Sequence, residues 1–147
     1  MSIESVTEGG ITYQVNTDEN GHKRWLLNGN RHRVDGPACE YASGSKLWYL
    51  NGKWHRVDGP AYEDANGTKR WYLNGKKHRV DGPAVERTNG TKEWYLNDER
   101  LTEGAFKRFR VKLKELKQHP LDAPLYLHDK YLGSIAQELL ENGGIPV

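Results

Sequence analysis

Histidine–arginine pairs recur along the chain every 23 residues, and their side chains are the ones best suited to chemistry. The pairs are His32-Arg33, His55-Arg56 and His78-Arg79. Imidazole can bind metals or transfer protons, and guanidinium can bind carboxylate or phosphate oxygens through paired N–H donors. The pairs could therefore form a metal site, a catalytic site, or a cationic row that grips an extended anionic partner.

A metal site does not fit this spacing. With two strands per repeat, histidines of neighbouring copies would lie about 10 Å apart, whereas ligands lie about 2 Å from a shared zinc ion. The single cysteine, Cys39, excludes a multi-cysteine zinc site, and we expect it to be a packing residue. The sequence has no Gly-rich phosphate loop, nucleophile elbow or helix-borne histidine pair. We therefore predict no metal, no cofactor and no enzymatic activity.

The arginines have a second interpretation that is purely structural. Each could pair with the aspartate of its own turn, at Asp35, Asp58 or Asp81. A structural role and a partner-binding role would both keep the three copies identical. The sequence leaves the two interpretations open.

Aromatic side chains provide further candidates. A row of tyrosines interleaved with lysines could be a base-stacking platform for nucleic acid or a second packed face; its members are Tyr49, Tyr72, Tyr95, Lys46, Lys69 and Lys92. Trp54 stands where the other copies have Arg31 and Lys77. An aromatic residue that the repeat does not require is a candidate interface anchor, the alternative being local packing.

The elements that must position these residues follow from the repeat itself. The aligned segments are RWLLNGNRHRVDGPA (24–38), LWYLNGKWHRVDGPA (47–61), RWYLNGKKHRVDGPA (70–84) and the decayed EWYLNDERLTEGAF (93–106). Asn-Gly between alternating residues is a strong two-residue hairpin signal. In one copy we expect strands over 61–64 and 69–73 and a short third segment over 76–79. Alternation places Trp71 and Leu73 on one face and Tyr72 on the other.

The pattern becomes helical after the array. We predict a β-repeat array with an N-terminal edge strand over 1–101, including a strand over 11–15, and a helical C-terminal cap over 102–147. A first helix over 102–118 has an apolar stripe at 3- and 4-residue steps, and a second helix is expected over 130–142, ended by Gly143. The segment 121–128 between them is expected to be extended or irregular.

The first of these helices carries many cations outside its apolar stripe. Those we single out as candidate binding residues are Lys107, Arg108, Arg110 and Lys112. On charge alone the helix could bind nucleic acid or a membrane surface, and the alternative is a solvated face above a docked stripe. We expect no membrane contact, since the bulky Phe106 and Phe109 are needed for packing.

The array resembles a known repeat superfamily, MORN (membrane occupation and recognition nexus), whose units of about 23 residues are short β-hairpins. More closely it is similar to variant repeats, Trp-Tyr-Leu-Asn-Gly-Lys-x-His-Arg-x-Asp-Gly-Pro-Ala, of uncharacterised tailed-bacteriophage proteins. The resemblance implies a mainly β fold, an elongated antiparallel β-hairpin repeat sheet of MORN-like units, to which the helical pattern adds two C-terminal capping helices. It also implies an interaction scaffold of a phage.

Composition narrows the function classes. The chain has 147 residues, 35% hydrophobic, 29% charged and 10% aromatic, with a net charge of +2, which argues against disorder. It contains no apolar run long enough to cross a membrane and no recognisable signal peptide, so we expect a cytoplasmic protein. The leading hypothesis is a non-enzymatic phage accessory protein that binds a host or phage protein, in host takeover or anti-defence. The alternatives are nucleic-acid or nucleotide binding and a phage structural or assembly component, and a homo-oligomer is possible.

Overall fold

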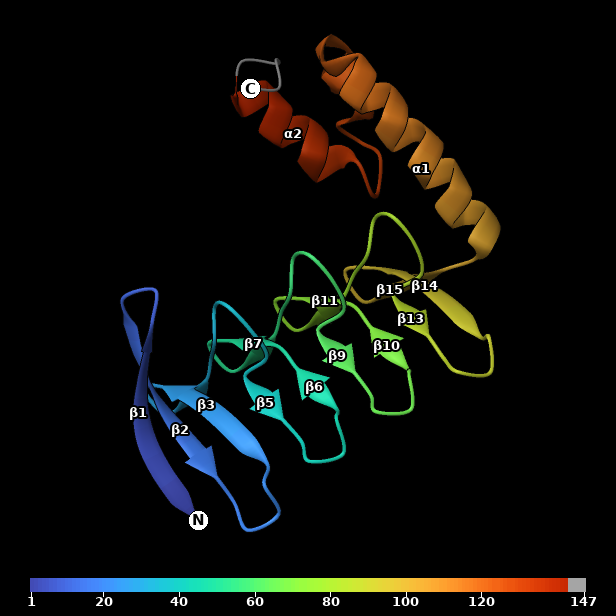
Figure 1. Ribbon diagram of the computed structural model, residues 1–147. Helices are drawn as coiled ribbons and strands as arrows, with labels where there is room; N and C mark the ends of the chain where they lie inside the picture. The colour runs from blue at the N-terminus through green and yellow to red at the C-terminus, as the bar shows by residue number, and fades with distance from the viewer. Residues whose placement is uncertain (143–147) are drawn as a thin grey trace. The chain divides into compact units, whose positions relative to one another are not determined.

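The computed structural model describes residues 1–142. The chain forms two compact units, Met1–Arg100 and Leu101–Val147. The fold is mainly β, with a long antiparallel sheet followed by helices at the C-terminus, as predicted (Figure 1).

An N-terminal hairpin starts the sheet. Strand β1 (Ser2–Glu8) pairs along its whole length with β2 (Ile11–Thr17), and β2 pairs with β3 (Lys23–Leu27). Strand β3 in turn pairs with the short β4 (Asn30–Arg31) and with β5 of the next copy. The predicted strand over 11–15 is confirmed and is one arm of this longer hairpin.

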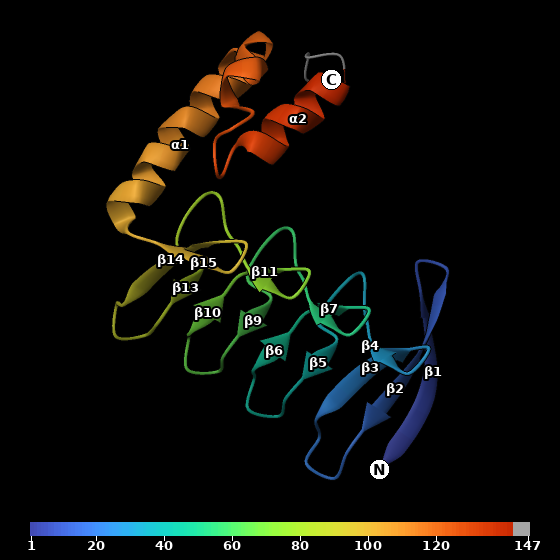
Figure 2. The same cartoon turned by 180° about the vertical axis from the view of Figure 1, so that it is seen from behind.

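Two short strands per repeat extend the sheet. The order within the described residues is β1-β2-β3-β5-β6-β9-β10-β13-β14-β15, with β4 beside β3. The added strands are β5 (Cys39–Glu40), β6 (Lys46–Leu47), β9 (Tyr62–Glu63), β10 (Lys69–Arg70), β13 (Val85–Glu86), β14 (Lys92–Leu96) and β15 (Glu99–Leu101). Pairs of strands thus step along the array at about 10 Å per repeat, a progression visible in both views (Figure 2).

The prediction of one continuous strand over 69–73 was wrong, because the backbone hydrogen-bonding pattern of the main sheet is interrupted at Trp71. Its N–H bonds to the Ala84 carbonyl and its carbonyl accepts from the His78 N–H. The chain then enters a separate local hairpin. These small hairpins are β7 (Tyr49–Leu50) with β8 (Lys53–Trp54) and β11 (Tyr72–Leu73) with β12 (Lys76–Lys77).

The Asn-Gly turns of the local hairpins have the backbone that their residue types predict. Asn51 and Gly52 have φ of 51° and 78°, both positive as in a type I′ turn. In the fourth copy an aspartate replaces the glycine, and Asp98 still adopts φ of 68°. Asparagine and aspartate tolerate this region, so the turn survives the decay of the consensus.

One core cluster of the array lies under its first copies, and its buried members are Tyr13, Val15, Trp25, Ala38, Cys39, Leu47 and Tyr49. Val85 and Leu96 of the later copies are also buried. Cys39 is 1% exposed, in agreement with the predicted packing role, and burial raises the pKa of its thiol. A thin sheet needs only a narrow core. This agrees with the small number of aliphatic residues in the chain.

The C-terminal unit contains helix α1 (Glu103–Gln118), a 3₁₀ helix η1 (Pro120–Tyr126) and helix α2 (Gly133–Glu141). Helix α1 agrees with the prediction, since Thr102 caps it through its Oγ1 and the stripe Phe106, Phe109, Leu113 and Leu116 is buried. No helix in the described part of the chain is both long and apolar enough to span a membrane.

The predictions after α1 need correction. The segment expected to be irregular is the 3₁₀ helix, which starts at Pro120 and includes the Asp122 N–H to His119 carbonyl bond. Helix α2 begins later than expected because Asp129 Oδ1 accepts from the N–H groups of Tyr131 and Leu132, which holds a turn there. The expected stop at Gly143 lies outside the described residues.

Candidate functional site

The His-Arg-Val-Asp-Gly-Pro-Ala segments form one loop per repeat, which we call the repeat loops (32–38, 55–61 and 78–84). Each runs from a local hairpin to the next strand of the main sheet. Both ribbon views show the repeat loops in a row along one side of the array (Figures 1 and 2). The sheet therefore brings the three candidate pairs onto one side of the array.

The histidines join each copy to the next. Each imidazole Nδ1 accepts a hydrogen bond from the backbone N–H of the turn asparagine in the following copy. The N···N distance is 2.9 Å from Asn51 to His32 and 3.0 Å in each of the next two copies. A nitrogen that accepts is unprotonated, and burial lowers the pKa of His78. The histidines thus serve as neutral joints between repeats.

The arginines are turned inward against the tryptophans. The guanidinium carbon lies 3.5, 3.9 and 3.8 Å from the ring centroid of the tryptophan in the same copy. In each copy Nη1 also donates to the loop proline carbonyl at 3.0–3.1 Å and to a glutamate seven residues on at 3.1–3.3 Å. Only 15%, 23% and 20% of the three arginine side chains is exposed. Each guanidinium is therefore engaged within the fold.

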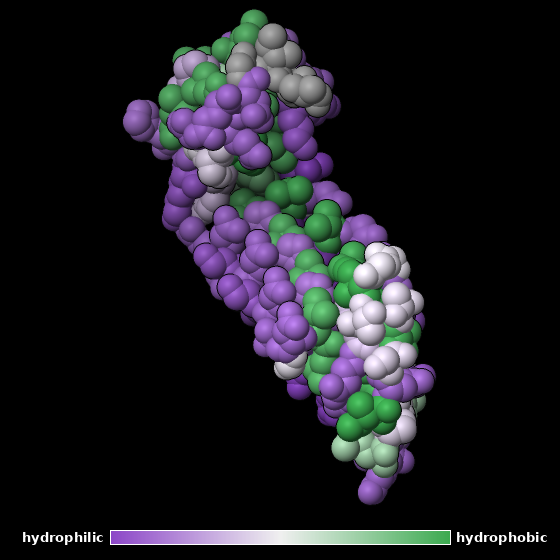
Figure 3. All heavy atoms as spheres, turned by 90° about the vertical axis from the view of Figure 1, so that its left-hand side faces the viewer, coloured by the Kyte–Doolittle hydropathy of each residue, from purple (hydrophilic) through white to green (hydrophobic). Residues whose placement is uncertain are grey.

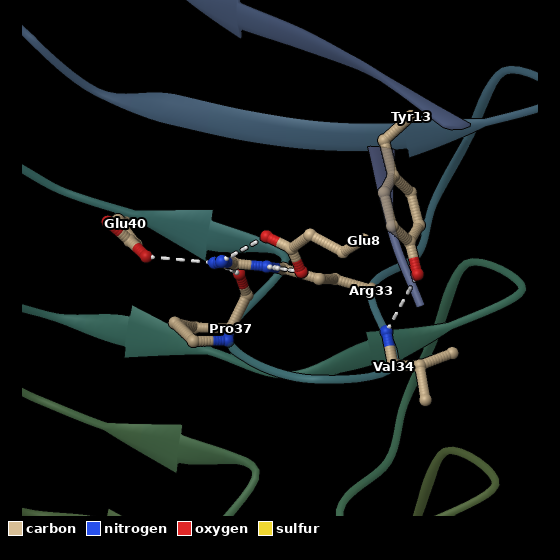
Figure 4. A network of polar contacts seen from close by, with 6 residues as sticks. All are labelled: Glu8, Tyr13, Arg33, Val34, Pro37 and Glu40. Carbon is tan, nitrogen blue, oxygen red and sulfur yellow. Dashed lines mark hydrogen bonds and ion pairs between the residues drawn. The ribbon is translucent and has the colours of Figure 1, made fainter. Parts of the chain in front are cut away.

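The predicted arginine–aspartate pairing is confirmed in two copies and wrong in the first. Arg56 Nε lies 3.1 Å from Asp58, and Arg79 Nε lies 2.8 Å from Asp81. Arg33 instead donates to both carboxylate oxygens of Glu8, at 3.3 and 2.8 Å (Figure 4). Strand β1 ends at Glu8 beside this loop, and a bidentate partner displaces the single contact to aspartate.

The loop glycine and alanine also have structural roles. A Cβ built on Gly59 would lie 2.8 Å from the Arg56 guanidinium carbon, so glycine leaves room for the stacked arginine. The loop alanines are 0% exposed, and their carbonyls accept hydrogen bonds from the backbone N–H of the tryptophan in the same copy at 2.7–2.8 Å.

In the first two repeat loops valine and aspartate are the exposed residues, whereas in the third loop Val80 is half-buried and only Asp81 is exposed. Val34 is 56% exposed and Val57 is 84% exposed, and the Asp58 side chain is 86% exposed despite its ion pair. The first two repeat loops border a cleft of about 730 Å³ whose floor includes Trp48 and Leu50. Surface colouring shows apolar surface running along the array beside hydrophilic surface (Figure 3). Each of the first two loops thus exposes one valine and one aspartate, beside a cleft that Arg33 and Arg56 also line.

Trp54 belongs to a ladder of rings. It lies across its local hairpin from Tyr49, with ring centroids 4.7 Å apart, and stacks on Tyr72 of the next copy at 5.3 Å. The residues at its position in the neighbouring copies, Arg31 and Lys77, place a cation over the next copy's tyrosine at 5.4 and 4.8 Å from the ring. This position therefore covers the following tyrosine in all three copies, and the covered ring faces are not open platforms for bases.

Helix α1 places its predicted cations on the surface. Lys107 pairs with Glu103 at 3.5 Å, and Lys112 pairs with Asp129 at 3.2 Å. Arg108 and Arg110 are also exposed. The helix combines an apolar buried stripe with a solvated basic surface.

The glutamates were missed by the sequence reasoning. Glu40, Glu63 and Glu86 bind the inward arginines in successive copies, and their spacing of 23 residues was the available signal. Within the described residues no group of three or more His, Cys, Asp or Glu side chains could hold a metal ion. In comparisons with protein-family models, curated proteins and solved structures, no match to this chain was found.

Proposed function

We propose that this protein is a non-enzymatic scaffold that binds a protein partner on the outward side of the repeat loops. The observation that supports this is the direction of the loop side chains. The guanidiniums of Arg33, Arg56 and Arg79 point inward and are engaged, while the loop aspartates and the valines of the first two loops face solvent. An apolar and acidic row complements a protein surface better than a phosphate backbone.

The biological setting that we propose rests on the resemblance to phage repeat proteins. We infer an accessory protein that acts on a host factor in the cytoplasm of an infected cell, in host takeover or in blocking a defence. A binding scaffold without enzymatic activity would act there by occupying its target.

The test is partner binding by a double variant of the exposed valines. We expect Val34→Ser with Val57→Ser to weaken binding to a partner isolated from host lysate at least tenfold, because the partner loses apolar contact. The control is Val111→Ser, which removes a valine of similar exposure, 58%, from helix α1. Undiminished binding by the double variant, with the far-ultraviolet circular dichroism of the wild type, would show that the loops are not the site.

A second candidate function is binding of nucleic acid by α1. The supporting observation is a surface hollow along the helix that is lined by Arg110, Val111, Leu113, Lys114, Lys117 and Gln118. A duplex or single strand would bind there with steep salt dependence. We expect Lys114→Gln with Lys117→Gln to abolish a mobility shift at low salt, and a shift that persists in this variant would remove the candidate.

A further inference from the structure

Val34 and Val57 are the exposed apolar side chains of the first two repeat loops. Histidine joins the copies, arginine stacks on tryptophan, and aspartate or its substitute binds arginine. Glycine makes space, the proline carbonyl accepts from arginine, and alanine is buried. Yet Val57 keeps 84% of its surface in water. An exposed β-branched apolar side chain, repeated in a loop whose other members all have internal roles, points to contact with another molecule.

The spacing of the loops determines how far apart the contacting side chains of a ligand would have to be. Two main-sheet strands separate successive loops, which corresponds to about 10 Å. Three residues of polyproline II span about 9 Å and complete one turn, so every third side chain returns to the same face. In a β-strand, residues three apart point to opposite faces, so polyproline II is the extended conformation that fits. A side chain at every third position would therefore meet one loop interval after another.

The cleft between the loops favours an extended chain over a helix. Its lining includes Val34, Val57, Trp48 and Leu50 as well as Arg33, His55 and Arg56, and its volume is about 730 Å³. A single large apolar side chain can enter it. A helix with its side chains is about 10–12 Å wide. This is at least the interval of about 10 Å between successive loops, so an extended chain fits between them better.

The charge of the loops indicates which residues of a bound peptide would stand between its apolar ones. Each loop carries one aspartate toward solvent, with the Asp58 and Asp81 side chains 86% and 68% exposed. The arginines of the same loops are at most 23% exposed. Basic side chains on the ligand would therefore find a carboxylate at every step of the row.

We propose that the repeat loops bind an extended peptide segment with an apolar side chain at every third residue and basic residues between them. This inference rests on the proposed protein-binding function and specifies the class of its partner. One apolar side chain enters the cleft between Val34 and Val57, those three residues before and after it lie against the adjacent loops, and the basic residues pair with Asp35, Asp58 and Asp81.

The test uses synthetic peptides and fluorescence anisotropy with the full chain. The probe is a labelled twelve-residue peptide of four Leu-Lys-Ser units, and its matched control has the same composition with leucine at every second position. We expect the three-residue period to bind at least tenfold more tightly than the control. We also expect V34S/V57S to lose that binding and V111S to retain it.

Three outcomes would overturn this inference. They are equal affinity for both peptides, equal binding of a peptide with Glu in place of Lys, and preference for a heptad-patterned helical peptide. Binding of an oligothymidine that V34S/V57S abolishes would assign the row to nucleic acid instead. If V34S/V57S releases the lysate partner while the peptides show no periodic preference, the proposed function stands and only the peptide class is wrong.

Discussion

At the scale of single residues, the repeat loop is built around one stacked arginine. In the second copy Arg56 covers the Trp48 ring at 3.9 Å and is held by Asp58 and Glu63. A partly desolvated guanidinium on indole with carboxylate partners contributes about 2 kcal/mol. The residues that look most reactive in the sequence are therefore structural.

The first prediction follows from the space under this arginine. Arg56→Ala should lower the free energy of unfolding by about 2 kcal/mol, and Gly59→Ala by a similar amount, because the new Cβ displaces the guanidinium. The double variant should lose little more than either single one, since both remove the same stack. Urea denaturation measures all three. Additive losses would show that Gly59 acts independently of Arg56, and Arg100→Ala, an exposed arginine, is the control.

The second prediction concerns Trp54. Arginine and lysine cover the following tyrosine in the neighbouring copies, so Trp54→Arg should cost less than about 1 kcal/mol. Trp54→Ala uncovers Tyr49 and Tyr72 and should cost about 2–3 kcal/mol. Thermal or urea unfolding distinguishes the two variants. If Trp54→Arg keeps stability but weakens partner binding tenfold, Trp54 is an interface anchor as well as a packing residue.

At the scale of elements, the repeats are joined by hydrogen bonds from the local hairpins. The turn asparagine donates to histidine Nδ1, and the next turn residue, as in Gly52, donates to the carbonyl of Arg31 at 2.9 Å. Both bonds need the positive φ of the type I′ turn to aim the N–H groups at the preceding copy. The type I′ turns therefore form the local hairpins and also direct the hydrogen bonds between neighbouring copies.

The third prediction is a loss of stability in mild acid. The folded-state pKa of His78 lies below its unfolded value of about 6.5, so the unfolded chain binds more protons. The histidine contribution is then present above about pH 6.5 and is lost as the pH falls through the folded pKa. Protonation of His78 Nδ1 also removes the hydrogen bond from the Asn97 N–H, worth about 1 kcal/mol.

The measurement is urea unfolding between pH 7.5 and 5, above the range where most carboxylates titrate. The variant His78→Asn keeps an acceptor that does not titrate, so its stability should depend less on pH than that of the wild type. A wild-type stability that is constant over this range would contradict the role of the histidines as neutral joints.

At the scale of the whole molecule, the chain combines a repeat array with a helical unit. Each copy in the array meets its neighbours through the same strand pairs and the same turn-to-histidine bonds. Stability in such arrays is approximately a sum over copies and nearest-neighbour interfaces. The first copy is special because β1 supplies Glu8 to Arg33.

The fourth prediction is that one complete repeat can be removed. Deletion of residues 62–84 joins Ala61 to Val85, in the register of the existing junctions, and should leave a folded protein. Its urea m-value should fall by roughly one sixth, in proportion to the chain removed. Deletion of one residue fewer should prevent cooperative unfolding, because it moves every later side chain to the opposite face. Circular dichroism and urea titration report both results.

Much of the array could be predicted because its signals are local. Asn51-Gly52 specifies a hairpin by its φ preferences, and the period of Trp48 and its equivalents specifies stacking. The break at Trp71 could not be predicted, because it depends on bonds to Ala84 and His78, whose positions follow from the stacked copies. The late start of α2 was missed because Asp129 Oδ1 holds a local turn that the apolar spacing does not indicate.

The sequence by itself determined that this protein is a β-hairpin array with a 23-residue period, followed by helices, because turn residues and periodicity act over a few residues. Only the tertiary structure decided which side of each loop faces outward. Arg33 binds Glu8 from 25 residues away and Glu40 from the next strand, contacts that no local pattern encodes. Each guanidinium binds nearby carboxylates and stacks on an indole. The repeat loops, which appear cationic in the sequence, therefore expose their aspartates, and in the first two copies also their valines.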